Sequence, residues 1–162
     1  MARDGWPEDW AERKAGGDCP ICAGLVHPRS RDLVTGASLT STVVRLDPRS
    51  RLPGYCVVAW NGQHVAEAFA LSKDQSAAYW ADVSRVARAI DRVFQPMKIN
   101  LMTLGNWVPH LHTHIVPRYA DDPAPGNPIS WEDMFYDEPL PDATLRDHAE
   151  RLAAVLYGTE ST

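Results

Sequence analysis

Residues 110–118 read His-Leu-His-Thr-His-Ile-Val-Pro-Arg, and this run constrains the fold of the chain more than any other. Its alternation and composition predict a strand over residues 109–119. Successive side chains of a strand point to opposite faces, so we expect the imidazoles of His110, His112 and His114 on one face of a sheet. Imidazole acts as a nucleophile, a proton carrier or a metal ligand near neutral pH, so such a row indicates a chemical function.

The composition is typical of one globular domain. The chain has 162 residues, of which 44% are hydrophobic and 23% are charged, so it is long enough to bury a core of its own. No apolar run is long enough to span a membrane, and the first residues lack the apolar core of a signal peptide. We therefore expect a cytoplasmic protein. The net charge of −5 argues against nucleic acid as a partner, because nucleic-acid binding usually requires a basic face.

The order of the predicted elements indicates an α+β fold. Ser72 and Gln75 form a capping box at the start of a helix over 73–94, along which apolar residues recur at helical spacing. Strands are expected at 39–46, 54–60 and 99–104, with a hairpin between the first two and a tight turn at Gly105-Asn106 before the histidine strand. This order of elements forms an antiparallel sheet rather than βαβ units.

We treat residues 1–162 as a single domain. Its four parts are a leader without periodic pattern at 1–18, a core at 19–119, a Pro-rich ordered loop or flap at 120–141 and a C-terminal helix at 142–158. Asp142 is the expected cap of that last helix, and Gly158 is its expected end. Two tryptophans, Trp107 and Trp131, can either stack on a base or serve packing.

Two of the three cysteines form the pair Cys19-Pro20-Ile21-Cys22. Such a pair either binds one metal ion or acts as a redox dithiol. The redox interpretation expects the pair just after a strand and before a βαβ pattern, whereas here it follows a polar leader, so metal binding is favoured. Cys56 lies in an apolar strand and is expected to be a buried small hydrophobic residue.

Three histidines in line allow several kinds of chemistry. A catalytic zinc ion held by three histidines and a water molecule is one possibility. Another is a nucleophilic histidine beside groups that neutralise an anion. A third is a polar strand face that satisfies its own hydrogen bonds, although burying three imidazoles without a purpose is costly.

The histidine run resembles the signature of the histidine triad (HIT) superfamily of nucleotide hydrolases and transferases. In that signature three histidines alternate with hydrophobic residues, and Thr113 is a departure that keeps the alternation. The resemblance extends from Cys19 to Arg118. It implies a HIT-like fold, in which an antiparallel sheet of about five strands carries a long central helix and a C-terminal helix. It also implies a homodimer.

The resemblance implies roles for residues outside the histidine run. Asp47 resembles the acidic residue that accepts hydrogen bonds from the ribose hydroxyls, although an Asp-Pro turn would also explain it. Asn100 is similar to the family Asn that contacts the substrate near the scissile phosphate. Gly54-Tyr55 begins a strand that resembles the family strand beginning Gly-His. The implied substrate is a purine nucleotide, such as a dinucleoside polyphosphate or an adenylylated small molecule.

The resemblance also implies a structural zinc ion and no organic cofactor. Many bacterial HIT proteins hold zinc through residues that match Cys19, Cys22, His64 and His110. The approach to His64 has one extra residue, and Asn61-Gly62-Gln63 replaces the usual basic pair. Two thiolates and two imidazoles form a normal tetrahedral zinc site, which would attach the leader to the sheet.

A mechanism follows from the same resemblance. His112 resembles the nucleophile that attacks an α-phosphorus and forms a nucleotidyl-histidine intermediate. His114 resembles the residue that contacts the phosphoryl oxygens. If zinc holds His110, the leaving-group proton comes from His114, from bound water or from the substrate.

The expected function is that of a nucleotide hydrolase which cleaves a phosphoanhydride or phosphoramidate bond at the α-phosphate. The alternatives are a nucleotidyltransferase or phosphorylase of the same superfamily, a non-catalytic nucleotide-binding module and a three-histidine zinc hydrolase. Residues 104–109 are shorter than the Gly-rich family loop that holds the phosphate, and they lack its Ser. Gly105 and Asn106 can still present backbone and amide donors to a phosphate.

Overall fold

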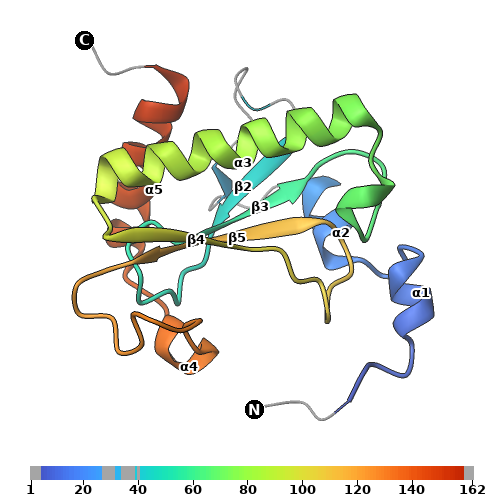
Figure 1. Cartoon of the computed structure of the whole chain (residues 1–162), viewed down its shortest axis with the longest axis horizontal. Coiled ribbons are helices and arrows are strands. Elements are labelled where there is room, and N and C mark those ends of the chain that lie inside the picture. Colours follow the sequence, from blue (N-terminus) through green and yellow to red (C-terminus); the bar gives the residue numbers. More distant parts are fainter. Residues whose placement is uncertain (1–4, 27–31, 34–38, 40, 159–162) are drawn as a thin grey trace.

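The structure is a computed structural model that describes residues 5–26, 32–33, 39 and 41–158. A five-stranded sheet has the order β1-β2-β3-β5-β4, with all neighbours antiparallel (Figure 1). The strands are β1 (Asp32–Leu33), β2 (Thr42–Leu46), β3 (Cys56–Trp60), β4 (Lys98–Met102) and β5 (His112–Arg118). The helices are α1 (Trp10–Lys14), α2 (Pro20–Val26), the short turn η1 (Ala68–Ala70), α3 (Lys73–Phe94), α4 (Trp131–Met134) and α5 (Asp142–Tyr157).

Helix α3 covers one face of the sheet, and α5 packs against α3 (Figure 1). The predicted capping box begins α3, since the Ser72 side chain accepts from the Gln75 amide and the Gln75 side chain accepts from the Ser72 amide. The apolar stripe of α3 packs on β2, β3 and β5 to form the main core. Its buried helical members are Tyr79, Val83, Val86, Ala89 and Ile90. The predicted helix over 73–94 is therefore confirmed.

The opposite face of the sheet carries the two histidines of β5. Alternation places His112, His114, Val116 and Arg118 on this face, while Ile115 packs into the main core under α3. Every residue of β5 is buried. The histidines are thus held on a rigid central strand rather than on a mobile loop.

A second, smaller core covers part of the histidine face. It consists of Tyr55, Val116, Ile129 and Met134, with partly buried apolar neighbours. The segment that contains α4 is fixed to the turn after β2 by backbone hydrogen bonds, because the Arg51 amide donates to the Met134 carbonyl at 2.7 Å. Figure 1 shows α4 on the side of the sheet opposite α3.

The strands around the histidine run are shorter than predicted. Strand β4 covers 98–102 and β5 covers 112–118, so residues 103–111 form a loop instead of a tight turn at Gly105-Asn106. In this loop the His110 amide donates to the Val108 carbonyl at 2.8 Å, which bends the chain before β5 begins. The prediction that all three imidazoles share one strand face is wrong for His110.

The ends of the chain also differ from the predictions. Helix α5 begins after Pro141, whose carbonyl accepts from the Leu145 amide, so Asp142 is the first helical residue and not its cap. Gly158 ends this helix in the left-handed conformation, as predicted. The short helices α1, α2 and α4 and the short strand β1 were not predicted, because so few residues carry no periodicity. Part of the predicted strand at 39–46 and of the predicted leader lies outside the described residues.

No helix in the described part of the chain is long and apolar enough to cross a membrane.

Candidate metal centre and active site

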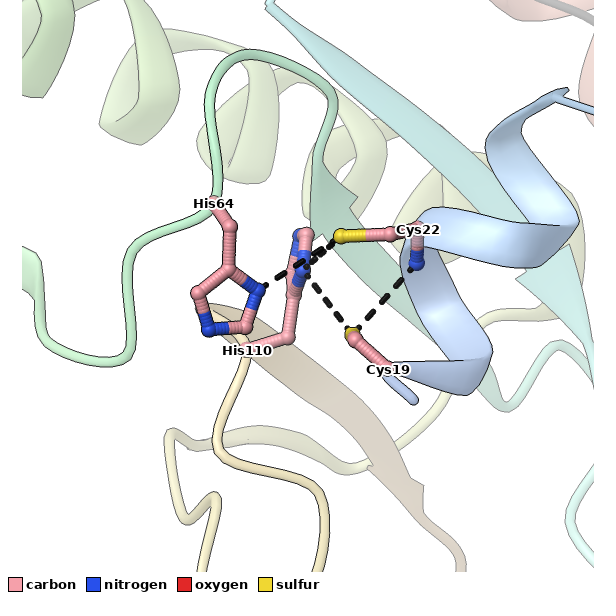
Figure 2. A group of neighbouring side chains, drawn as sticks. All are labelled: Cys19, Cys22, His64 and His110. Carbon is pink, nitrogen blue, oxygen red and sulfur yellow. Dashed lines mark hydrogen bonds between the residues drawn. The ribbon is translucent and has the colours of Figure 1, made fainter. Parts of the chain in front are cut away.

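Four side chains from three segments of the chain meet near the start of β5 (Figure 2). Cys19 precedes α2 and Cys22 lies in its first turn, His64 follows β3, and His110 lies near the end of the loop before β5. Their ligand atoms all lie within 4.8 Å of one another. The structure therefore brings together the four residues that the sequence predicted as metal ligands, and we call this group the metal centre.

The distances in the metal centre fit a tetrahedral ion of the size of zinc. Nδ1 of His110 lies 3.5 Å from Sγ of Cys19 and 3.4 Å from Sγ of Cys22. Nδ1 of His64 lies 3.5 Å from Sγ of Cys22. At usual zinc bond lengths and tetrahedral angles, a sulfur and a nitrogen ligand would be about 3.6 Å apart.

The surroundings of His110 prepare it to bind a metal ion. Its Nε2–H donates to the Trp60 carbonyl at 2.7 Å, which leaves Nδ1 unprotonated and facing the cysteines. Burial lowers the pKa of His110, so the neutral ring required of a ligand is favoured.

The cysteine pair lacks the environment of a redox dithiol. Burial, together with the neighbouring Cys19 thiol, raises the pKa of Cys22 to about 11. A reactive Cys-x-x-Cys pair requires a lowered thiol pKa, whereas a metal ion deprotonates a coordinating thiol outright. Metal binding therefore fits these residues better than redox chemistry. Cys56 is fully buried in the main core, as predicted.

The three histidines of the run do not converge on one metal ion. Both ring nitrogens of His110 point to partners other than His112 and His114. Across the described residues, the group of potential metal ligands that was found contains neither His112 nor His114. The geometry therefore gives no support to a three-histidine zinc hydrolase.

His112 is held in one protonation form by the backbone. Its Nδ1 lies 2.6 Å from the carbonyl oxygen of His110. A carbonyl only accepts hydrogen bonds, so Nδ1 carries the hydrogen and Nε2 of the neutral ring keeps its lone pair. Burial lowers the pKa of His112, which favours that neutral ring near pH 7. Nε2 of His112 is thus an available nucleophile.

His114 lies directly beside His112. Their ring centroids are 4.9 Å apart and the rings are inclined at 75°. Burial, with a smaller contribution from His112, lowers the pKa of His114 to about 4, so the ring is neutral at pH 7. The hydroxyl of Tyr55 lies 2.8 Å from Nδ1 of His114. Tyr55 was not predicted as a site residue, although its place where the family strand has His was a usable signal.

Aromatic side chains of the Pro-rich segment also border His114. Trp131 meets the His114 ring edge-on with centroids 5.5 Å apart, and it stacks on Phe135 at 13°. Half of the Trp131 surface remains exposed, so the ring is accessible next to the histidines. Trp107 lies elsewhere, in the loop before β5, where its carbonyl accepts a long hydrogen bond from Arg13 of α1.

Asp47 lies at the end of β2, next to this site. Leu46 pairs with Cys56, which places Asp47 beside Tyr55. One carboxylate oxygen, Oδ1, accepts from the Arg49 amide at 2.8 Å and stabilises the turn. The turn explanation for Asp47 is therefore correct for this oxygen, and within the described part of the chain no hydrogen bond to Oδ2 is found.

Asn100 lies on β4 opposite Val116, which puts it on the face that carries His114. Its Oδ1 accepts from Nη1 of Arg118 at 2.7 Å. Arg118 is itself buried and fixes the orientation of the Asn100 amide, in which Oδ1 is the acceptor and Nδ2 is a donor.

The loop between β4 and β5 contains the predicted phosphate-binding pair. Gly105 has a φ of 91°, a conformation that favours glycine, and Asn106 is exposed. A cavity of about 330 Å³ lies between this loop and α1, and its lining includes Arg13, Trp107 and Pro109 but neither His112 nor His114. The loop therefore contacts the N-terminal segment as well as the histidine strand.

The comparisons with known proteins agree with this architecture. The family model for the HIT domain matches residues 36–121, which is more than half of the chain and includes the histidine run. The chain therefore belongs to the HIT domain family. No curated protein sequence matches it significantly.

Solved structures share the fold. A histidine triad protein from Bradyrhizobium japonicum is 29% identical, with a TM-score of 0.64 over 73% of this chain and 86% of that chain. A hypothetical histidine triad nucleotide-binding protein from Sulfolobus tokodaii is 15% identical, with a TM-score of 0.66 over 86% of this chain and 93% of that chain. A zinc-bound histidine triad family protein from Mycobacterium smegmatis is 19% identical, with a TM-score of 0.63 over 88% of this chain and 95% of that chain. The predicted α+β HIT-like fold is confirmed.

Proposed function

We propose that the protein is a nucleotide hydrolase that cleaves a phosphoanhydride or phosphoramidate bond at the α-phosphate of a nucleotide. The observation that carries this proposal is the hydrogen bond from Nδ1–H of His112 to the His110 carbonyl. It leaves an unprotonated Nε2 on a buried strand, directly beside a second neutral imidazole, His114. A fixed and neutral imidazole is suited to nucleophilic catalysis.

The reaction proceeds in two displacements. Nε2 of His112 attacks the α-phosphorus, so a phosphorus–nitrogen bond forms while the bond from phosphorus to the leaving group breaks. Water then attacks the same phosphorus and releases a proton, which replaces the one that the leaving group takes up; the phosphorus–nitrogen bond breaks, the nucleoside monophosphate departs, and Nε2 regains its lone pair. His114 donates a hydrogen bond to the phosphoryl oxygens, where negative charge accumulates in each transition state.

The remaining predicted residues bind the rest of a purine nucleotide. Asp47 accepts from the ribose hydroxyls through Oδ2, and Asn100 donates to the phosphate through Nδ2. Gly105 and Asn106 supply donors from the loop before β5. The positions of Asp47 and Asn100 beside the histidine face support this assignment, as does the nucleotide-binding description of the Sulfolobus relative.

The metal centre holds a structural zinc ion that takes no part in the chemistry. Its four ligands are Cys19, Cys22, His64 and His110, and the zinc-bound relative from Mycobacterium supports the choice of metal. The ion would attach α2 to the start of β5 and hold the His110 carbonyl against His112. As in the family, the active protein would be a homodimer.

The proposal is tested by trapping the intermediate. Wild-type protein is incubated with α-labelled diadenosine polyphosphates and adenosine phosphoramidates and then quenched, and we expect acid-labile label on the chain. His112→Asn should form no labelled protein and should lower turnover by about 10⁴-fold or more, with an unchanged metal content. Label that persists in His112→Asn would exclude His112 as the nucleophile. Nucleotide binding without turnover in the wild type would favour a non-catalytic module.

A further inference from the structure

A buried contact connects Tyr55 to His114. The Tyr55 hydroxyl oxygen lies 2.8 Å from Nδ1 of His114, and Tyr55 is 2% exposed while His114 is 8% exposed. The contact follows from the register of the sheet, because Val57 pairs with His114 and Tyr55 lies two residues before Val57, on the same face. Tyr55 also packs edge-on against Phe135, which limits the movement of its ring.

The hydrogen of this contact belongs to Tyr55. Within the described part of the chain, Nδ1 of His114 is the hydrogen-bond partner found for the Tyr55 hydroxyl. If His114 donated instead, a buried O–H group would be left without an acceptor, which is costly. Burial, together with the nearby Asp47 carboxylate, raises the pKa of Tyr55, so the hydroxyl keeps its hydrogen. Nδ1 of His114 is therefore the acceptor, and Nε2 carries the hydrogen of that ring.

We propose that Tyr55 is a positioning residue that fixes His114 in its Nε2–H form, so that this nitrogen donates a hydrogen bond to the phosphoryl oxygens of the substrate. The proposal rests on the proposed hydrolase function. The two adjacent imidazoles are then held in opposite tautomers. The His110 carbonyl holds the hydrogen of His112 on Nδ1, whereas Tyr55 holds the hydrogen of His114 on Nε2. His112 presents a lone pair for attack and His114 presents a donor for charge stabilisation, with no proton transfer needed between them.

The chain provides a closely matched control in Tyr79. The Tyr79 hydroxyl lies 2.8 Å from Oγ1 of Thr113, the residue next to His114, on the opposite face of β5. Tyr79 is also fully buried, in the main core. Tyr55→Phe and Tyr79→Phe each remove one buried hydroxyl that contacts β5. A merely structural role would give the two variants similar effects.

The first measurement is the tautomer of His114 in the free protein, by nitrogen-15 NMR of the imidazoles, with the His114 signals assigned from their loss in His114→Asn. We expect hydrogen on Nε2 in wild type and in Tyr79→Phe, and a mixture of both forms in Tyr55→Phe. Hydrogen on Nδ1 in wild type would overturn the proposal, and so would an unchanged tautomer in Tyr55→Phe. This measurement requires no catalytic turnover.

The second measurement is the rate of labelling and turnover with an α-labelled diadenosine polyphosphate. Tyr55→Phe should lower kcat by about tenfold to a hundredfold with KM nearly unchanged, because the lost donor acts on the transition state. Tyr79→Phe should change kcat less than about threefold, since its hydroxyl faces away from the phosphate. Equal rates for Tyr55→Phe and wild type would also overturn the proposal.

The two measurements separate the failure of this proposal from the failure of the proposed function. If the wild type forms no labelled histidine and does not turn over any probe, the hydrolase function fails, and the NMR result alone decides whether Tyr55 fixes His114. If turnover is seen and Tyr55→Phe behaves like Tyr79→Phe, the hydrolase function stands and the role of Tyr55 fails.

Discussion

The two ends of strand β5 each fix a neighbouring segment that has no core pattern of its own. At the first end, the metal centre joins α2 to the sheet through Cys19, Cys22, His64 and His110. At the second end, the guanidinium of Arg118 donates to the Asp122 carboxylate and to backbone carbonyls of the Pro-rich segment. In our proposal the first anchor requires an ion from solution, whereas the second consists wholly of protein groups.

This difference shows that the chain attaches its two flanking segments to the sheet in two different ways. Among the described residues close to Cys19 few are buried, so ligand bonds to the proposed ion would replace a core that the segment lacks. The segment after Arg118 also contributes Ile129 and Met134 to the second core, so its attachment does not rest on one contact. We therefore expect the first end to respond to chelators and the second end not to respond.

The largest predicted effect is loss of the metal centre. Cys19→Ala should abolish metal binding and lower the free energy of unfolding by at least about 4 kcal/mol, since structural zinc contributes its binding energy directly to folding. Metal analysis and urea unfolding with and without a chelator measure both quantities. Cys56→Ala is the control, because Cys56 is buried outside the metal centre and should keep the metal. Metal retained by Cys19→Ala would contradict the assignment.

Sequence reasoning predicted the ligands of the metal centre better than it predicted the surrounding elements. The spacing of the Cys pair indicated Cys19 and Cys22 as metal ligands, because ligand chemistry restricts residue types strongly, whereas His64 and His110 were predicted as ligands only through the resemblance to the HIT family. The boundaries of β5 were wrong, since the bend at His110 comes from a loop hydrogen bond to Val108 that no composition signals. Helix α3 was predicted correctly because twenty-two residues carry both a capping box and a periodic apolar stripe.

Local sequence patterns do not predict the contacts around His114, and the one usable signal was the place of Tyr55 where the family strand has His. Tyr55 reaches His114 only through the pairing of β3 with β5, and Trp131 reaches it only because α4 is bound to the turn after β2. Register and tertiary docking join residues that are 59 positions apart in the first case, and local patterns contain no such information. The same holds for Arg118, whose partners lie in a segment predicted only as a loop or flap.

A smaller loss of stability is predicted when the pH is lowered, and it arises at His114, which lies in β5 between the two ends. The pKa of His114 falls from 6.5 to about 4 on folding, so protonation favours the unfolded chain. Stability from this group is complete above pH 6.5 and is lost as the pH falls towards 4, by at most about 3 kcal/mol. Urea unfolding from pH 7 to pH 4 should show a larger fall in the free energy of unfolding for wild type than for His114→Asn. Metal release at low pH affects both proteins equally, so it does not contribute to the difference. Parallel curves would contradict it.

The smallest effect is predicted at the second end of β5. Arg118 and Asp122 form an ion pair four residues apart whose side chains are 7% and 3% exposed, while Arg151 and Asp147 form a pair of the same spacing whose side chains are 47% and 60% exposed. Asp122→Asn removes the charge that balances a buried guanidinium and should cost about 2 kcal/mol. Asp147→Asn should cost less than about 0.5 kcal/mol, because water screens an exposed pair.

Metal content and chelator response distinguish this second anchor from the first. Asp122→Asn should keep a full complement of metal. In urea unfolding, a chelator should lower the free energy of unfolding of this variant by the same amount as in wild type. Limited proteolysis should meanwhile cut more readily between Arg118 and Met134, because the guanidinium no longer fixes that segment. If Asp122→Asn lost its metal, the two ends of β5 would be one cooperative unit, and the ion would stabilise the Pro-rich segment as well as α2.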